Sequence, residues 1–281
     1  MLAFICLSTK RKNMAENRHS GRPGSIERSI PALTALPRPV LSRAESLPAG
    51  SHTRLHAHEW AQFSYALSGV LEVRTLQASF MAPPQRAIWV PAGVEHVVTT
   101  STPTEMRSLY ISESALQMVP PTCRVLAVTP LLRELIVALS RFPAEYDEAG
   151  AAGRLVAVLF DELQGLEELE LNLPLPRDLR LQQLCAGLQT HPDDRRTLDE
   201  WGGVLGLSAR SLARLFQQET GMSFGQWRLR LRLLLALGAL ERGKSVTRVA
   251  LDSGYESTSA FIAVFRHVFG VTPRTMFPFS R

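Results

Sequence analysis

Three histidines in the first half of the chain are the residues whose types and spacing best suit chemistry. His56 and His58 are separated by one residue, so on an extended strand both imidazoles point to the same face, about 7 Å apart. His96 can close a facial site for a divalent metal if another strand brings it near them. The alternative is that the three side chains are partly buried polar residues that line a pocket for a small molecule.

Two arginines in the last third of the chain suit a different kind of recognition. Ser208 is a good helix N-cap, and Arg210 and Arg214 follow it one helical turn apart. An arginine can donate two parallel hydrogen bonds to guanine in the major groove of DNA. If this helix does not enter DNA, the same arginines form only its solvated face.

The elements that would position these arginines are two short helices joined by a tight turn. The pattern predicts helices over 198–205 and 209–220, with Gly206 in the turn and Gly221 at the end. The same order recurs further along the chain, with a helix over 246–253, a turn at Gly254, a cap at Ser257, a helix over 259–269 and a terminator at Gly270.

A long apolar helix over 224–242 is expected to join the two units and to be packed by both. Two helix-turn-helix units about 34 Å apart can place their second helices in successive major-groove segments of DNA. Residues 172–281 carry 15 Lys+Arg against 9 Asp+Glu, whereas residues 29–171 carry 10 against 15. A basic end after an acidic middle indicates a polyanionic partner, with a merely solvated basic surface as the alternative.

The histidines lie in a region of closely spaced strand-like runs, from about residue 40 to residue 111, which predicts a sandwich or barrel. Two apolar stripes with helical spacing follow, over 130–142 and 151–166. These helices pack on the barrel, pair with the same helices of a second copy to form a homodimer, or do both. Acidic residues and two prolines over 166–177 predict a linker.

The spacing of the histidines resembles the two sequence motifs of the cupin fold, a jelly-roll barrel. The matching residues are Gly50, His56, His58, Gln62, Gly69, Pro91, Gly93 and His96. The resemblance implies a metal site of three histidines and one carboxylate, but Gln62 stands where the carboxylate would be. Gln85 and Thr100 also replace a glycine and an asparagine of the motif. The candidate metal ligands are therefore His56, His58 and His96, and the predicted effector pocket comprises His56, His58, Gln62, Tyr65, Trp89 and His96.

The segments "LSARSLARLFQQETGMSFGQWRLRLRL" and "GKSVTRVALDSGYESTSAFIAVFRHVFGVTP" resemble the AraC/XylS family of transcription regulators. The resemblance covers about residues 178–279, and a cupin-like sensor ahead of this region is the usual arrangement of that family. It implies promoter DNA and a small-molecule effector as partners, with RNA polymerase as a further one. The region around His56 and His96 also resembles a subgroup whose members often control neighbouring efflux-type transporters.

Carried over from the family, the base contacts of the first recognition helix fall on Arg210 and Arg214, with Ser211, Gln217 and Gln218 also within reach of DNA. In the second helix the matching positions are Thr258, Ser259 and Ala263, and many relatives carry arginine at the last of these. We therefore expect the second helix to read few bases and mainly to dock on the backbone. The residues expected to face phosphates are Arg266, His267 and Arg274.

The bulk properties set the remaining limits. Apolar residues make up 45% of the 281-residue chain, which is enough for two ordinary domains. Cys6, Cys123 and Cys185 have no paired spacing, so we expect neither a disulfide framework nor a zinc–thiolate site, and a reducing cytoplasm fits. The first 28 residues read as a flexible arm, within which Met14 is an alternative start.

The fold prediction is α+β: a flexible arm over 1–28, a cupin-like sensor with its following helices over 29–165, a linker over 166–177, and an all-α domain with two helix-turn-helix units over 178–281. The function predicted from this order is a cytoplasmic, non-enzymatic regulator that binds a nearby promoter in response to an effector. The alternatives are a metal-dependent, dioxygenase-like cupin enzyme with a helical appendage, and a dimerisation module that does not bind DNA.

Overall fold

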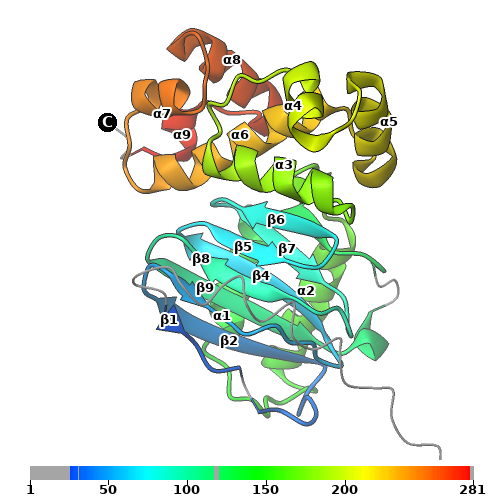
Figure 1. Ribbon diagram of the computed structural model, residues 1–281. Coiled ribbons are helices and arrows are strands. Elements are labelled where there is room, and N and C mark those ends of the chain that lie inside the picture. The colour runs from blue at the N-terminus through cyan, green and yellow to red at the C-terminus, as the bar shows by residue number, and fades with distance from the viewer. Residues whose placement is uncertain (1–25, 31, 117–119, 279–281) are drawn as a thin grey trace, which may run out of the picture.

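The computed structural model describes residues 26–30, 32–116 and 120–278, which form a β-domain and a helical domain (Figure 1). Most of the predicted arm, including Cys6 and Met14, lies outside these ranges. The β-domain has two six-stranded sheets. Sheet A has the order β1 (Ile26–Glu27), β3 (Ser51–His52), β8 (Val97–Thr100), β5 (Leu71–Arg74), β6 (Ala78–Ala82) and β12 (Asn172–Pro174). Sheet B has the order β11 (Glu168–Leu169), β10 (Arg124–Ala127), β7 (Arg86–Val90), β4 (Ala61–Ser68), β9 (Thr104–Ile111) and β2 (Val40–Leu47).

The central strands of sheet B, β7, β4 and β9, are largely buried on both faces, and strand β4 shows how the sequence is divided between them. Ala66 and its cross-strand partner Met106 pack with residues of sheet A in the space between the sheets. Phe63 and Tyr65 point the other way and pack with the helices that follow the barrel. Successive side chains of a strand alternate between faces, so Gln62 and Ser64 share the inner face with Ala66.

Two backbone positions explain residues singled out in the cupin-like motifs. Gly69 has φ +87°, and a Cβ there would lie 2.2 Å from Thr104 Oγ1, so only glycine fits this turn. Gln85 has φ +64°, a left-handed conformation that glycine adopts most readily. Gln85 thus adopts a backbone conformation that suits the glycine of the motif.

Helices α1 (Pro130–Leu139) and α2 (Ala151–Gln164) cover the outer face of sheet B. Pro130 starts α1, and Thr129 Oγ1 caps it by accepting from Leu132 N. The inward residues Leu132, Ile136 and Leu159 are almost completely buried, and each such side chain stabilises the fold by about 1.5–3 kcal/mol. The structure therefore shows these helices packed on the barrel.

The segment 166–177, expected to be a linker, instead carries two short strands. Strand β11 pairs with β10 in sheet B, and β12 pairs with β6 at the edge of sheet A. Leu171 and Leu173 are buried there. These strands form through partners far away in the sequence, which is why the prolines and acidic residues alone favoured a linker.

The helical domain begins with α3 (Leu179–Thr190), which the sequence pattern did not single out, and ends with α9 (Pro273–Met276). The first helix-turn-helix unit consists of α4 (Leu198–Leu205) and α5 (Ala209–Thr220), with the predicted bounds. The second unit consists of α7 (Val246–Asp252) and α8 (Thr258–Phe269), and each of these helices differs from its predicted bounds by one residue. Helix α6 (Phe224–Glu241) joins the two units.

Helix α6 is buried on several sides, and it also contacts the β-domain. Trp227 Nε1 donates to the carbonyl of Pro174 in β12 at 2.8 Å, and Arg230 bonds the carbonyl of Asn172. At the other end, Glu241 accepts from the backbone N–H of Gly69 at 2.9 Å. Figure 1 shows the helical domain resting on the barrel, with α3 next to β6. The expected α+β architecture is confirmed, and no helix in the described ranges is long and apolar enough to cross a membrane.

Candidate effector site and nucleic-acid interface

The three histidines meet at one end of the β-domain. His56 and His96 form an isolated antiparallel bridge, in which each backbone N–H donates to the carbonyl of the other residue. Their ring centroids lie 4.3 Å apart, and the ring of His58 lies 5.2 Å from that of His96. The segment that carries His56 and His58 runs between β3 and β4 and is extended but irregular. One potential ligand nitrogen from each ring lies within 4.8 Å of the other two.

In all three histidines, Nδ1 is the ring nitrogen that hydrogen-bonds to a backbone carbonyl. The Nδ1 atoms lie 3.0, 2.6 and 2.8 Å from the carbonyl oxygens of Arg54, Trp60 and Val94, for His56, His58 and His96 respectively. A carbonyl can only accept, so each Nδ1 carries the proton and donates it. In the neutral rings the Nε2 atoms are then left with free lone pairs. This is the arrangement that orients a histidine as a metal ligand.

Burial keeps two of these rings neutral. The pKa of His96 is lowered to about 3, mainly by burial and also by the positive charge of the neighbouring histidines and Arg28. The pKa of His56 is also lowered, mainly by burial. His96 is completely buried, and its Nε2 has no hydrogen-bond partner within the described part of the chain. An unpaired buried acceptor of this kind costs free energy unless a ligand satisfies it.

Gln62, on β4, lies beside the three histidines. Its Oε1 lies 2.9 Å from His58 Nε2, and its Nε2 donates to Ser64 Oγ at 2.8 Å. Gln62 is nearly fully buried, at 2% exposure, so its amide group has these two side chains as its polar neighbours. Sequence reasoning placed Gln62 in the pocket, and the structure brings it to the histidines.

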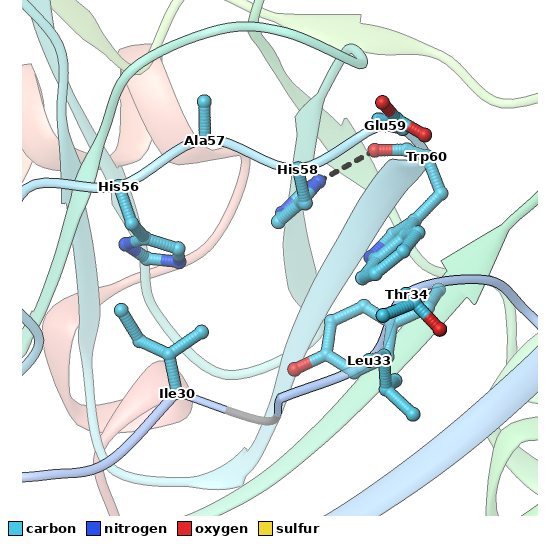
Figure 2. A pocket seen from close by; sticks show the side chains of 9 residues that line it. Ile30, Leu33, Thr34, His56, Ala57, His58, Glu59 and Trp60 are labelled. Atoms are coloured by element: carbon cyan, nitrogen blue, oxygen red, sulfur yellow. Dashed lines mark hydrogen bonds between the residues drawn. The ribbon is translucent and has the colours of Figure 1, made fainter.

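A cavity of about 350 Å³ opens beside the histidines (Figure 2). Ile30 and Leu33 face His56 and His58 across it, and Trp60 lies beside His58. Tyr110 also lines this cavity. The predicted pocket did not include Tyr110, and it included Gln62 and His96, which lie beside His56 and His58 but do not line this cavity. Strand register would have identified Tyr110, because Tyr110 on β9 lies directly opposite Gln62 on β4.

Tyr65 and Trp89, which were expected in the pocket, lie elsewhere. Both belong to the hydrophobic cluster between sheet B and helices α1 and α2. Trp89 also donates from Nε1 to the carbonyl of Pro120. Gln62 and Tyr65 are three residues apart on one strand, so the alternation of a strand puts them on opposite faces.

The donor set fits a divalent metal in part. The three Nε2 atoms and Gln62 Oε1 offer imidazole and amide ligands, and the unpaired His96 Nε2 is accounted for if it binds an ion. Ligand atoms around a tetrahedral Zn²⁺ lie about 3.3 Å apart, so the rings must move closer by up to about 1.5 Å. No Asp or Glu joins the three histidines as a ligand group in the described ranges.

The second candidate site is the outer face of α5. Ser208 caps the helix by accepting from Ser211 N, and its hydroxyl also donates to Ser211 Oγ at 3.0 Å. Leu212 and Phe216 are buried on the inner face. The outer face exposes Arg210, Arg214, Gln217 and Gln218, and leaves Ser211 half-buried. The Gln217 amide donates to the carbonyl of Gly221 at 2.8 Å, so this side chain helps to terminate the helix.

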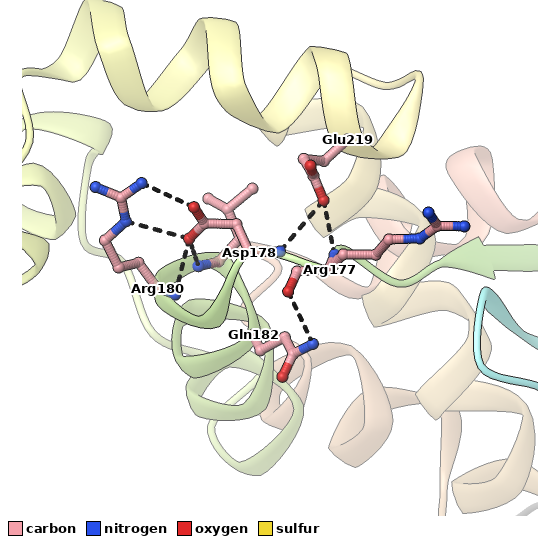
Figure 3. Close-up of polar contacts among 6 residues, drawn as sticks. Arg177, Asp178, Arg180, Gln182 and Glu219 are labelled. Atoms are coloured by element: carbon pink, nitrogen blue, oxygen red, sulfur yellow. Dashed lines mark hydrogen bonds and ion pairs between the residues drawn. The ribbon is translucent and has the colours of Figure 1, made fainter. Parts of the chain in front are cut away.

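A polar junction holds α5 against the start of the helical domain (Figure 3). The carboxylate of Glu219 on α5 accepts from the backbone N–H groups of Arg177 and Asp178. Asp178 in turn caps α3 by accepting from Arg180 N, and it pairs with the Arg180 guanidinium. The Arg180 side chain holds the pKa of Asp178 at about 2. The orientation of α5 is thus fixed at its C-terminal end.

The second recognition helix, α8, presents a different face. Phe261, Phe265 and Phe269 point into the core, and Ser257 caps the helix by accepting from Ala260 N. Its outer positions are Thr258, half-buried, and the exposed residues Ser259, Ala263, Arg266 and His267. Arg274 is exposed on α9. The ion pairs formed by residues 26–30, 32–116 and 120–278 do not involve Arg210, Arg214, Arg266 or Arg274.

Other arginines of the helical domain are engaged with carboxylates. Arg248 pairs with Asp252 one turn further along α7, at 2.9 Å. Arg196 pairs with Asp194 and lies over the ring of Trp201. Unpaired arginines on the outer faces of the two second helices are what a nucleic-acid interface requires.

Comparison with known proteins assigns both domains. Residues 38–163 match the family described as "AraC-like ligand binding domain", and residues 201–277 match the family described as "Helix-turn-helix domain".

Two curated relatives and one solved structure illustrate the range of similarity. The chain is 38% identical over 219 residues to the HTH-type transcriptional regulator NimR of Escherichia coli strain K12, covering 78% of this chain and 80% of that protein. It is 35% identical over 102 residues to the HTH-type transcriptional regulator RipA of Corynebacterium glutamicum, covering 36% and 31%. ToxT from Vibrio cholerae is a distant structural likeness, with 12% identity, a TM-score of 0.37, and coverage of 87% of this chain and 100% of that one.

The two matches divide the chain as the structure does, with the ligand-binding family on the two-sheet domain and the helix-turn-helix family on α4 to α9. The match to NimR runs across both. The cupin-enzyme alternative is thereby replaced, because the family is not enzymatic. The chain belongs to the AraC family of DNA-binding transcription regulators with an N-terminal ligand-binding domain.

Proposed function

We propose that this regulator binds a promoter near its own gene in the cytoplasm and responds to a small molecule held in the histidine cavity. The observation that carries the DNA-binding part is the outer face of α5, where Arg210 and Arg214 are exposed and unpaired on a helix whose inner face is buried. Both guanidinium groups are free to donate to guanine. The resemblance to regulators of efflux-type transporters favours a transporter gene as the target.

The two recognition helices are proposed to divide the work. Arg210 and Arg214 on α5 read bases, with Ser211 and Gln218 within reach of the same groove. Helix α8 presents Thr258, Ser259 and Ala263 where base contacts would be made, and none of them has the reach or the two parallel donors of arginine. Helix α8 therefore docks on the backbone, with Arg266, His267 and Arg274 toward the phosphates.

Footprinting on the DNA upstream of the gene tests the DNA-binding part. The full chain should protect two segments about one helical turn apart on one face of the duplex. Adding the effector should change the protection or the affinity. Equal binding to the upstream region and to unrelated DNA would contradict sequence-specific regulation at this promoter.

In the sensor, His56, His58 and His96 are proposed to bind a divalent metal through their Nε2 atoms, with Gln62 Oε1 beside them. When bound, the metal would supply an electrophilic contact point for an effector in the cavity. The protein's own residues orient the site, because three backbone carbonyls fix the Nδ1 protons. The rival proposal is a metal-free pocket in which the same nitrogens accept hydrogen bonds from the effector.

Metal analysis separates these two proposals. The full chain, purified without chelator, is expected to retain close to one equivalent of divalent metal, since a site with three histidine ligands binds tightly. The double variant His56→Ala/His58→Ala should lose it, whereas His267→Ala on α8 should keep it. Occupancy below about 0.1 equivalent in the unmodified protein would leave only the metal-free pocket.

A further inference from the structure

The histidine centre has an excess of positive charge once a divalent ion is bound. The three imidazoles and the Gln62 amide are neutral ligands, so they leave the charge of the ion uncompensated. The charged groups that act most on the pKa values of His56 and His96 are the other histidines and Arg28. The carboxylate that lines the cavity, Glu59, is exposed to solvent. Buried charges in proteins are usually paired, so a dication here calls for an anion.

A second, independent feature adds to this positive charge. Arg28 and Arg43 both pair with Glu45, at 2.6 and 2.8 Å, and the three side chains are largely buried at 12%, 28% and 12% exposure. One carboxylate between two guanidinium groups leaves one positive charge in excess. Arg43 bonds the Tyr110 hydroxyl, and Arg28 also acts on Tyr110, so this charge lies behind a wall of the cavity.

The contact between Gln62 and His58 points to a cation at this end of the cavity. With His58 Nδ1 donating to Trp60 and Gln62 Nε2 donating to Ser64, two acceptors face each other at 2.9 Å. Two ligands bound side by side to one ion, each about 2.1 Å from it, lie about 3.0 Å apart in octahedral and about 3.4 Å apart in tetrahedral geometry. An ion shared by these two atoms relieves their repulsion, and so does a reversed amide or a second proton on His58.

We infer that the effector of this regulator is a small anion, a carboxylate or a similar oxyanion, that completes the coordination of the metal and takes the place of the missing protein carboxylate. This inference rests on the proposed metal site. The anionic group reaches the ion beside His56 and His58. The rest of the molecule lies between Ile30, Leu33 and Trp60, which make that part of the cavity apolar. A cavity of about 350 Å³ is at the small end of ligand pockets, which limits the effector to a small molecule.

Cobalt(II) provides the readout, because its visible absorption reports the ligands around it. The full chain is stripped of metal, loaded with one equivalent of Co²⁺ and titrated separately with benzoate and with benzamide. The two probes have nearly the same shape and differ in charge. Benzoate should change the Co²⁺ spectrum in a saturable way, and benzamide should leave it unchanged.

Two variants locate the effect. Gln62→Glu supplies the missing negative charge, so it should tighten Co²⁺ binding and weaken benzoate binding, each by about 10-fold. Arg28→Gln removes part of the excess positive charge and should weaken benzoate by about threefold. The matched control is Arg248→Gln, since Arg248 also pairs with a carboxylate but is 71% exposed and lies on α7, in the other domain. It should leave both affinities unchanged.

The outcomes separate the inference from the proposal beneath it. If Co²⁺ binds but benzoate and benzamide act alike, the anion inference is wrong and the metal site stands. If the folded wild-type chain binds no Co²⁺, the metal proposal itself is wrong, and the DNA-binding proposal is unaffected. The comparison of the two probes uses the wild-type chain, so it decides the inference even if Gln62→Glu does not fold.

Discussion

The two helix-turn-helix units share one backbone plan and differ in the side chains that they expose. Ser208 and Ser257 cap the second helices in the same way, and Gly221 and Gly270 end them in the left-handed conformation. Counted from the caps, the buried positions coincide: Leu212, Phe216 and Thr220 in α5 correspond to Phe261, Phe265 and Phe269 in α8. The outward positions do not coincide, because Arg210 and Arg214 correspond to Ser259 and Ala263.

The residues that determine the fold of each unit are therefore separate from the residues that are proposed to contact DNA. The caps and the buried side chains determine the backbone conformation of each unit, and they occupy equivalent positions in both. The outward side chains leave the core untouched, so they can differ without a cost in stability. The comparison also explains why one unit is proposed to read bases and the other to hold the backbone.

The largest expected effect tests what the units share. Phe216 and Phe265 are both completely buried at equivalent positions. Replacing either by alanine should lower the free energy of unfolding by about 3–5 kcal/mol, through lost burial and the cavity left behind. Urea denaturation followed by circular dichroism measures this, with Val268→Ala on the exposed face of α8 as a control. A loss below about 1 kcal/mol for one of the two would show that the units are not packed alike.

The next effect tests the arginines that only the first unit has. Arg214→Ala should weaken binding to the footprinted operator by about 1–3 kcal/mol and flatten the preference at one base pair. Titration on the operator and on its point mutants measures both quantities. Arg154→Ala, which removes one exposed charge from α2, should leave the base preference as it is. An unchanged base preference in the Arg214→Ala variant would show that Arg214 on α5 does not contact a base.

The converse substitution tests the same difference in the second unit. Ala263→Arg places in α8 the side chain that α5 has at the equivalent position. Because the backbone plan is shared, the variant should gain a preference for guanine at one base pair of about 1 kcal/mol. Selection of preferred sites from random DNA detects it. If no new preference arises at any position, α8 does not enter the groove as α5 does.

The smallest effect concerns the phosphate contacts of the second unit. Arg266→Ala should weaken all DNA sequences alike, and the slope of log affinity against log salt should fall by about one. Titrations at several salt concentrations on operator and random DNA give this slope. A changed base preference would mean that α8 reads sequence after all.

The sequence predicted the helical domain more fully than the β-domain, for a physical reason. Helix ends depend on local contacts, and the caps at Ser208 and Ser257 and the glycines at 206, 221 and 270 lie next to the helices they delimit. The predicted bounds of α4 and α5 were confirmed, and α8 begins one residue earlier than expected. Strands depend on distant partners, so β11 and β12 could not be recognised in a segment that reads as a linker.

The candidate pocket shows the same limit in miniature. The three histidines and Gln62 were predicted from spacing, and the structure brings them together. Tyr110 was missed because it reaches the pocket only through the register of β9 against β4. Tyr65 and Trp89 were expected there, although counting by twos along β4 from Gln62 would have placed Tyr65 on the opposite face.

The measurement that tests the account most directly is the ratio of operator affinity to random-DNA affinity, taken at the same salt for the wild type, Arg214→Ala and Arg266→Ala. The account predicts that Arg214→Ala lowers this ratio by roughly 10-fold, because it removes a base contact. It predicts that Arg266→Ala leaves the ratio unchanged while both affinities fall. A ratio that falls for Arg266→Ala and stays constant for Arg214→Ala would contradict the assignment of base reading to the first unit and backbone docking to the second.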